Sequence, residues 1–112
     1  MSRAAERDAA DAALFSALGD QTRLALVKRL GAGVALSATT LGAGARVSRQ
    51  AIVKHLQVLE GAGLVHHEKR GREVLYSLEA RRIEEARAFL DGISAAWDRA
   101  IARLRRLVED DH

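Results

Sequence analysis

The sequence predicts a mainly α-helical domain that carries one small β-hairpin. Apolar residues recur at helical spacing over roughly the first sixty residues, at a spacing of two between residues 65 and 78, and at a spacing of seven beyond residue 80. A chain of 112 residues, 48% of them hydrophobic, can build one hydrophobic core but not two. We therefore expect residues 1–112 to form a single domain of four helices, a hairpin and a last long helix.

Two amphipathic helices are predicted at the start of the chain. The first runs from Ala4 to Leu18 and ends at Gly19, because glycine has a poor helix propensity. Asp20 then offers a side-chain oxygen that can cap a second helix, and Gly31 stops that helix. A short third helix is expected to begin near Ser37, although the glycines that follow weaken its continuation.

A fourth helix is predicted over about residues 48–62. Ser48 is a suitable N-cap residue, and Ile52, Leu56 and Leu59 fall at positions i, i+4 and i+7, which places them on one buried stripe. Gly63 fits a glycine C-cap. This helix therefore has one face toward the core and one face free for other contacts.

The period of two indicates a β-hairpin over about residues 65–78. Val74, Tyr76 and Leu78 alternate with other side chains, and a polar break that contains Gly71 separates them from the preceding strand. A last helix over about residues 80–108 follows from apolar residues at heptad positions. The pattern fits either one long helix or a helix broken once, with Gly92 as the expected break point in the second case.

This order of elements is the one that a helix-turn-helix with an appended wing requires. The free face of the fourth helix and the hairpin tip carry amide and cationic side chains. Glutamine can pair with adenine, and arginine or lysine with guanine, while cations at a hairpin tip can follow the phosphate backbone. The residues predicted to contact double-stranded DNA are Ser37, Ser48, Arg49, Gln50, Val53, Lys54, His55, Gln57, Lys69, Arg70 and Arg72.

Two readings of these polar surfaces stay open from the residues alone. The first is sequence-specific DNA binding by a transcriptional regulator. The second is a winged-helix module that docks another protein, with the basic face merely solvated. The occurrence of two basic surfaces in this order along the chain favours the first.

Three segments of the sequence resemble the ArsR family of winged-helix transcriptional regulators. The resemblance covers most of the chain, and its middle segment is highly specific for the family. The tail from Phe89 through Trp97 to Val108 resembles one branch of this family, the branch whose genes often lie next to genes for START-like SRPBCC proteins. The segments that carry the resemblance are LGDQTRL (18–24), VSRQAIVKHLQVLEGAGLV (47–65) and GREVLYSL (71–78).

The resemblance implies a homodimeric repressor. Family members pair through their first and last helices, insert the recognition helix into the major groove and touch flanking DNA with the wing. The heptad seam of the last helix agrees with this, and Trp97 is expected in the dimer core instead of lining a small-molecule pocket. The predicted dimer interface comprises Leu14, Phe15, Leu90, Ile93, Trp97, Ile101 and Leu104.

The sequence departs from the family pattern at three places. Gln21 stands where family members usually have proline, so the second helix loses a pre-organised first residue. Gly42 and Gly44 occupy a helix in which helix formers are expected. The cysteine pair with which founding members bind arsenic, cadmium or lead is absent, because the chain has no cysteine.

Several other functions are disfavoured. None of His55, His66, His67 and His112 forms the helical pair with a carboxylate that a zinc-sensing member needs, so we expect no metal and no cofactor. We find no nucleophile elbow, phosphate-binding loop or paired carboxylates, and therefore expect no enzyme. No apolar run is long enough to cross a bilayer, so we expect a cytoplasmic protein with no membrane partner. The sequence identifies no small-molecule effector.

Overall fold

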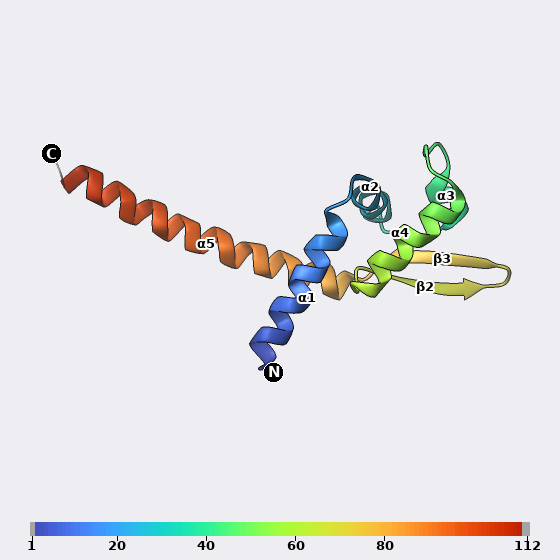
Figure 1. Cartoon of the computed structure of the whole chain (residues 1–112), viewed down its shortest axis with the longest axis horizontal. Helices are drawn as coiled ribbons and strands as arrows, with labels where there is room; N and C mark the ends of the chain where they lie inside the picture. Colours follow the sequence, from blue (N-terminus) through green and yellow to red (C-terminus); the bar gives the residue numbers. More distant parts are fainter. Residues whose placement is uncertain (1, 111–112) are drawn as a thin grey trace.

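The structure is a computed structural model, which describes residues 2–110. A compact helical unit with a projecting hairpin forms one end of the molecule, and a single long helix extends away from it (Figure 1). The molecule measures 69 × 36 × 21 Å. The mainly α-helical fold with a hairpin wing is therefore confirmed.

Two helices, α1 (Arg3–Leu18) and α2 (Gln21–Leu30), begin the chain. The Asp20 carboxylate accepts a hydrogen bond from the backbone N–H of Arg23 at 3.0 Å, so the predicted cap of α2 is present despite the missing proline. A short helix α3 (Ala38–Gly42) follows, and then α4 (Arg49–Gly61). Leu14, Leu26 and Leu30 pack with the buried residues of α3 and α4 in one core.

The hairpin consists of β2 (Val65–Arg70) and β3 (Glu73–Leu78), which pair antiparallel with Val65 opposite Leu78. A further strand, β1 (Leu36–Ser37), pairs antiparallel with β3 and completes a sheet of order β1-β3-β2. The sequence analysis missed β1. A strand of two residues is too short to show an alternating pattern, and its only signal is the helix cap at its end.

The last helix, α5 (Ala80–Asp110), has 31 residues and runs without interruption. Of the two alternatives, the structure shows the one long helix, and α5 does not break at Gly92. A Cβ at Gly92 would have nothing within 4 Å, so no close approach requires glycine there. A glycine in a helix interior costs only about 1 kcal/mol, which is too little to break a helix of this length.

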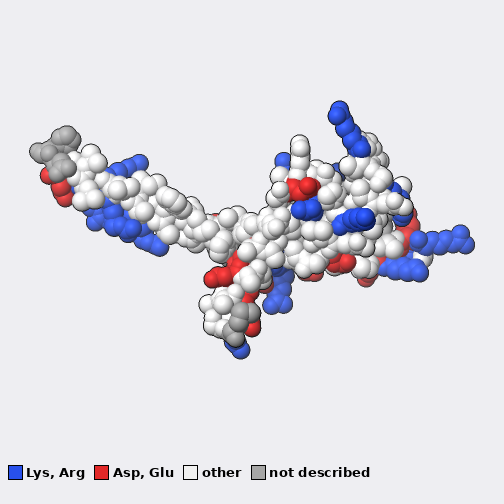
Figure 2. Space-filling model, in the orientation of Figure 1, with Lys and Arg blue, Asp and Glu red and all other residues white. Residues whose placement is uncertain are grey.

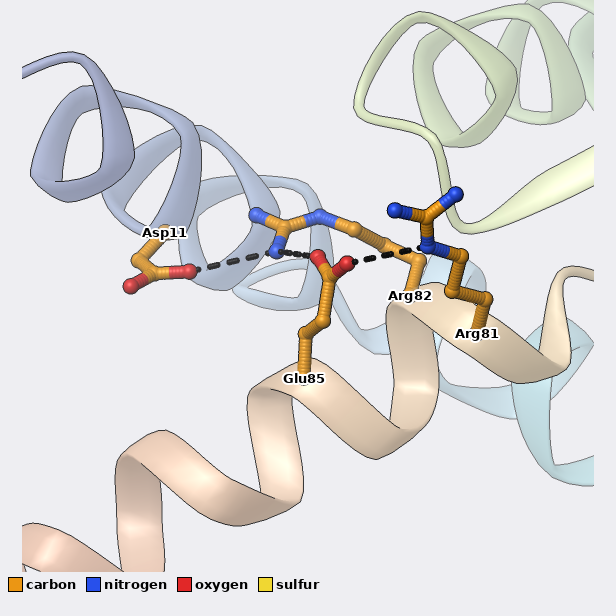
Figure 3. A network of polar contacts seen from close by, with 4 residues as sticks. All are labelled: Asp11, Arg81, Arg82 and Glu85. Carbon is orange, nitrogen blue, oxygen red and sulfur yellow. Dashed lines mark hydrogen bonds and ion pairs between the residues drawn. The ribbon is translucent and has the colours of Figure 1, made fainter. Parts of the chain in front are cut away.

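Polar contacts tie the base of α5 to α1 (Figure 3). Nη1 of Arg82 lies 3.2 Å from Oδ1 of Asp11 and 2.9 Å from Oε2 of Glu85, while Nε of Arg81 lies 3.5 Å from Oε1 of Glu85. Asp11 and Arg82 are largely buried, which makes this ion pair costly to break from one side. Among residues 2–110, Nη2 of Arg82 is a buried nitrogen without a hydrogen-bond partner.

Candidate nucleic-acid interface

Helix α4 is fixed at both ends and along its inner face. The Ser48 hydroxyl accepts a hydrogen bond from the N–H of Ala51 at 3.1 Å, as predicted for an N-cap. Ile52, Leu56 and Leu59 are at most 1% exposed. At the far end Gly63 has a positive φ of 79°, and the N–H of Leu64 donates to the carbonyl of Leu59 at 3.0 Å, which closes the helix in a Schellman motif.

The outer face of α4 carries the polar side chains that the sequence analysis selected. Gln50, Lys54 and Gln57 are exposed and lie on the side opposite the buried stripe. Val53 is partly buried and packs against the core, so only part of its side chain faces outward. Arg49 is exposed at the first turn of the helix, and its Nε donates to the hydroxyl of Thr39 at 3.2 Å. The N-terminal half of α4 therefore presents amide and cationic groups together.

Helix α3 is held against α2 by one arginine. Nη1 of Arg29 donates to the carbonyls of Thr40 and Leu41, at 3.1 and 2.8 Å, near the C-terminal end of α3. The Ser37 hydroxyl accepts from the N–H of Thr40 at 3.1 Å and so caps the same helix. Ser37 thus has a structural role here, and its hydroxyl is already engaged within the chain.

His55 is placed differently from the expectation. Its side chain is 23% exposed, and its Nδ1 lies 3.3 Å from Nη1 of Arg23 and 3.9 Å from Oδ2 of Asp20. Nε of the same arginine donates to the carbonyl of Ala17 at 2.6 Å. His55 therefore joins α4 to the α1–α2 corner and does not lie on the outer face. Its position, one residue from the buried Leu56, turns it to the side of the helix.

The Asp20 carboxylate at this corner has a lowered pKa. The largest cause is the backbone hydrogen bond from Arg23, which lowers the pKa. Desolvation is the next largest and raises it, while electrostatic interactions with Arg23 and His55 lower it further. Asp20 is consequently ionised at neutral pH and acts as both a helix cap and an electrostatic partner.

The hairpin tip is a two-residue turn with glycine at its first central position. Gly71 has a φ of 63°, as a type II′ turn requires, and the turn lies between the paired residues Arg70 and Glu73. Lys69, Arg70 and Arg72 are all exposed. Nη2 of Arg70 lies 3.4 Å from Oε2 of Glu68, an exposed pair that leaves the tip predominantly cationic.

Histidine–carboxylate contacts join β2 to the end of α4 and to the residue that precedes α5. Nδ1 of His67 contacts Oε1 of Glu60 at the end of α4, and Nδ1 of His66 lies 3.2 Å from Oε2 of Glu79. Tyr76 packs beside His67 with ring centroids 5.7 Å apart. Burial raises the pKa of Tyr76, and the charge of Glu60 raises it further, against a smaller opposite effect of Arg49. These contacts fix where the wing points relative to α4.

The cationic side chains gather at the end of the molecule that carries α3, α4 and the hairpin, and again on the distal half of α5 (Figure 2). Two exposed residues at the first end were not selected from the sequence. Arg46 lies in the turn between α3 and α4, and Thr39 contacts Arg49 directly. The position of Arg46 inside the helix-turn-helix turn was a signal that could have identified it.

The residues predicted for a dimer interface divide into two groups. Leu90, Ile93, Trp97, Ile101 and Leu104 are between 41% and 65% exposed in the single chain. Phe15 is partly buried, and its ring lies 5.6 Å from that of Phe89. Leu14, however, is completely buried in the chain's own core, so its side chain is not available to a partner. The apolar pattern of α1 could not show that Leu14 is buried in the chain's own core while the adjacent Phe15 is only partly buried.

The described residues contain neither a cluster of potential metal ligands nor a helix suited to span a membrane. Between Ser2 and Asp110, no three histidine, cysteine, aspartate or glutamate side chains cluster so that they could hold a metal ion. His66 and His67 contact different carboxylates, and His112 lies outside the described residues. No described helix combines the length and the apolar character needed to span a bilayer. The expectation of no bound metal stays a prediction.

Comparison with known proteins agrees with this geometry. Residues 18–68 match a family model described as a helix-turn-helix domain. The HTH-type transcriptional regulator Rv2034 of Mycobacterium tuberculosis is 34% identical over 97 residues, which cover 87% of each chain.

Solved structures show the same fold. An ArsR-like transcriptional regulator from Rhodococcus sp. RHA1 is 38% identical, with a TM-score of 0.75 over 88% of this chain and 92% of that one. The winged helix-turn-helix domain Mb0332 of Mycobacterium bovis, described as homodimeric, is 19% identical with a TM-score of 0.68, over 85% of this chain and 87% of that one.

The fold, the exposed face of α4 and these relatives define a winged helix-turn-helix transcriptional regulator that binds DNA. Within that class the chain belongs to the ArsR family. The relatives are described as transcriptional regulators, and this does not favour the protein-docking module as the function.

Proposed function

We propose that the protein is a homodimeric repressor that binds a pseudo-palindromic operator. Two copies of α4 would enter successive major grooves, with half-sites centred about 10 bp apart, and the dimer would occlude a promoter. Such a repressor acts in the cytoplasm of a bacterial cell, where the chromosome lies. The observation that carries the proposal is the exposed polar face of α4 beside the cationic hairpin tip, at one end of the molecule.

The two surfaces have different tasks in this proposal. Gln50 and Lys54 project from the N-terminal half of α4, where side chains of a recognition helix reach base edges. Lys69, Arg70 and Arg72 lie on a narrow projection that can reach flanking phosphates or the minor groove. Base contacts would supply sequence preference, and wing contacts would supply affinity. His55 and Ser37 are left out of the contact set, because their side chains are engaged within the chain.

The dimer is supported by the apolar face of α5. Leu90, Trp97 and Leu104 are at least half exposed in the single chain, and an apolar stripe of this length is typical of an interface. The Mycobacterium bovis domain of the same fold is described as homodimeric. Phe15 and Phe89, whose rings meet at a tilt between α1 and α5, would lie at the edge of the same surface.

The experiment is selection of bound duplexes from a random library by the purified full-length protein, at two salt concentrations. We expect a palindromic motif whose affinity falls steeply with salt, since binding releases counterions from the phosphates. Enrichment of a motif without two-fold symmetry would overturn the dimeric operator. Absence of duplex binding at low salt by the folded protein would overturn the DNA contacts altogether.

Three variants separate the proposed contacts. Gln50→Ala should relax base preference at one position of each half-site, at about 1–3 kcal/mol for that base pair. Arg72→Ala should weaken all duplexes similarly and reduce the salt dependence. The matched control is Arg3→Ala, which removes the same charge at the opposite end of the compact unit (Figure 1). Equal behaviour of all three variants would contradict the assignment.

A further inference from the structure

A hollow of about 470 Å³ lies between α1 and the base of α5. Pockets that bind small molecules have volumes of this order. The DNA contacts proposed above do not involve it. Two arginines, two carboxylates and two apolar residues line the hollow: Arg7 and Asp11 from α1, and Arg82, Glu85, Ala88 and Phe89 from α5.

One guanidinium in the lining is shared between two carboxylates. Nη1 of Arg82 contacts both Asp11 and Glu85, whereas its Nη2 is buried without a hydrogen-bond partner among residues 2–110 (Figure 3). A guanidinium has five N–H donors and can bind a carboxylate through two of them at once. A further acceptor oxygen is therefore the group that Arg82 lacks.

Glu85 is the contact of Arg82 that an incoming ligand can replace. Its side chain is 49% exposed, against 9% for Asp11, and its Oε1 already lies 3.5 Å from Nε of Arg81. A ligand carboxylate can take the place of Glu85 on Arg82 while Glu85 stays paired with Arg81.

Arg7 adds a second positive charge to the hollow. It lies on the α1 side, its side chain is exposed, and within residues 2–110 it forms no ion pair. Its guanidinium is therefore available to the same carboxylate that contacts Arg82.

The remaining lining of the hollow is apolar and adjoins an aromatic pair. Ala88 and Phe89 form it, and the ring of Phe89 lies 5.6 Å from that of Phe15 at an interplanar angle of 42°. Phe89 is still 37% exposed, so another ring can pack on it. Aromatic rings favour offset or tilted neighbours of this kind. Ala88 leaves room for such a ring, because its side chain is a single methyl group.

We propose that the hollow binds a small aromatic carboxylate. The carboxylate contacts Arg7 and Arg82, and the ring lies on Ala88 and Phe89. The two kinds of lining are thus used by the two halves of one molecule, a charged head and an apolar body.

Arg82 also connects the hollow to the recognition helix. Its Cγ and Cδ lie beside Gly63, which follows α4, at 3.7 and 3.8 Å from the place that a Cβ of this residue would occupy. A ligand that moves Arg82 therefore shifts the end of α4 relative to α1 and α5, and so changes the affinity for DNA. This second step rests on the DNA contacts proposed above, whereas binding of the ligand does not.

The probe for the site is naphthylacetate, with naphthylacetamide as its neutral control. Each is titrated into the full-length protein without DNA, and the heat of binding is measured. We expect saturable binding of the acid with a Kd of about 1 mM or lower, and binding of the amide that is at least about tenfold weaker, because it has no charge for the arginines. Absence of saturation by the acid, or equal binding of acid and amide, would overturn the site.

Two variants remove the charge and the space. Arg7→Ala should weaken binding of the acid about tenfold, and Ala88→Trp should abolish it, because an indole ring fills the hollow. The matched control is Arg87→Ala, which removes the same charge from an exposed position of α5 outside the lining and should bind as the wild type does. Retained binding by a folded Ala88→Trp protein would place the ligand elsewhere and overturn the proposal.

A second copy of the chain is the competing occupant of the hollow. Sedimentation equilibrium of the wild type and of Ala88→Trp distinguishes it from a ligand. Weaker self-association of Ala88→Trp, together with no binding of the acid by the wild type, would show that the partner fills the hollow and would overturn the ligand site.

Duplex binding measures the connection to α4. Saturating naphthylacetate should weaken binding of the selected duplex about fivefold in the wild type and in Arg87→Ala, but not in Ala88→Trp, because moving Arg82 disturbs the arrangement that presents α4. Unchanged duplex affinity with the acid bound would overturn the connection through Arg82. A wild-type protein that binds the acid but no duplex would support the site and contradict the DNA contacts.

Discussion

Helices α4 and α5 have similar apolar repeats but opposite surroundings. In α4 the repeating residues Ile52, Leu56 and Leu59 are at most 1% exposed, because α1, α2, α3 and β2 surround that side of the helix. In α5 the repeating residues beyond Ala86 are at least two-fifths exposed, apart from the small Ala100. An apolar repeat therefore indicates that a helix has a partner, but it does not indicate whether the partner belongs to the same chain.

The strongest test of this difference is a truncation in the inner face of α4. Leu56→Ala should lower the free energy of unfolding by about 2–5 kcal/mol, because a completely buried side chain is lost and a cavity remains. Urea denaturation at a fixed protein concentration measures the change. A loss below about 1 kcal/mol would mean that the compact unit is much looser than the structure shows.

A substitution in the seam of α5 should act on association instead. Trp97→Asp should yield monomers by light scattering, since it places a charge in the middle of the proposed interface, while the unfolding of the compact unit stays nearly unchanged. The matched control is Ala102→Asp, an exposed position outside the stripe on the same helix. A Trp97→Asp protein that remains dimeric would contradict the proposed interface.

A smaller effect is expected at the corner where α4 meets α1 and α2. The lowered pKa of Asp20 means that its contribution to stability is present above the unfolded-state pKa and is lost as the pH falls through the lower folded-state value. Wild-type protein should therefore lose stability relative to Asp20→Asn as the pH falls from about 5 to below the ordinary aspartate pKa of 3.8, because asparagine keeps a cap oxygen but does not titrate. The free energy of unfolding of both proteins is measured by urea denaturation at several pH values. The same pH dependence in both would show that this carboxylate is not coupled to folding.

Most of the fold could be predicted from local signals. The caps at Asp20, Ser37 and Ser48 and the glycines at positions 63 and 71 each satisfy a backbone requirement of their own segment, so each could be identified without knowledge of distant contacts. Strand β1 and the continuity of α5 could not be recognised in this way. The first depends on pairing with β3 across the chain, and the second depends on helix length outweighing one glycine.

The candidate interface was predictable at the level of helix faces but not of individual side chains. Helical spacing separated Gln50 and Lys54 from the buried stripe, and both are exposed. His55 lies beside the buried stripe of α4, where a small rotation decides whether a side chain packs inward, and Leu14 lies on the buried face of α1 directly before the partly buried Phe15. The rotation of a helix about its axis depends on how the neighbouring helices pack against it, so the apolar repeat of one helix does not predict it.

The buried pair of Asp11 and Arg82 has a mechanical consequence. It joins α1 to the first turn of a helix of 31 residues, and such a helix is about 46 Å long. A tilt of about 5° at this joint would move the far end of α5 by about 4 Å, which is about three quarters of the length of one helical turn. The Asp11–Arg82 ion pair at the base of α5 therefore sets the direction of the helix, and a small change in that contact would cause a large displacement of the C-terminal end.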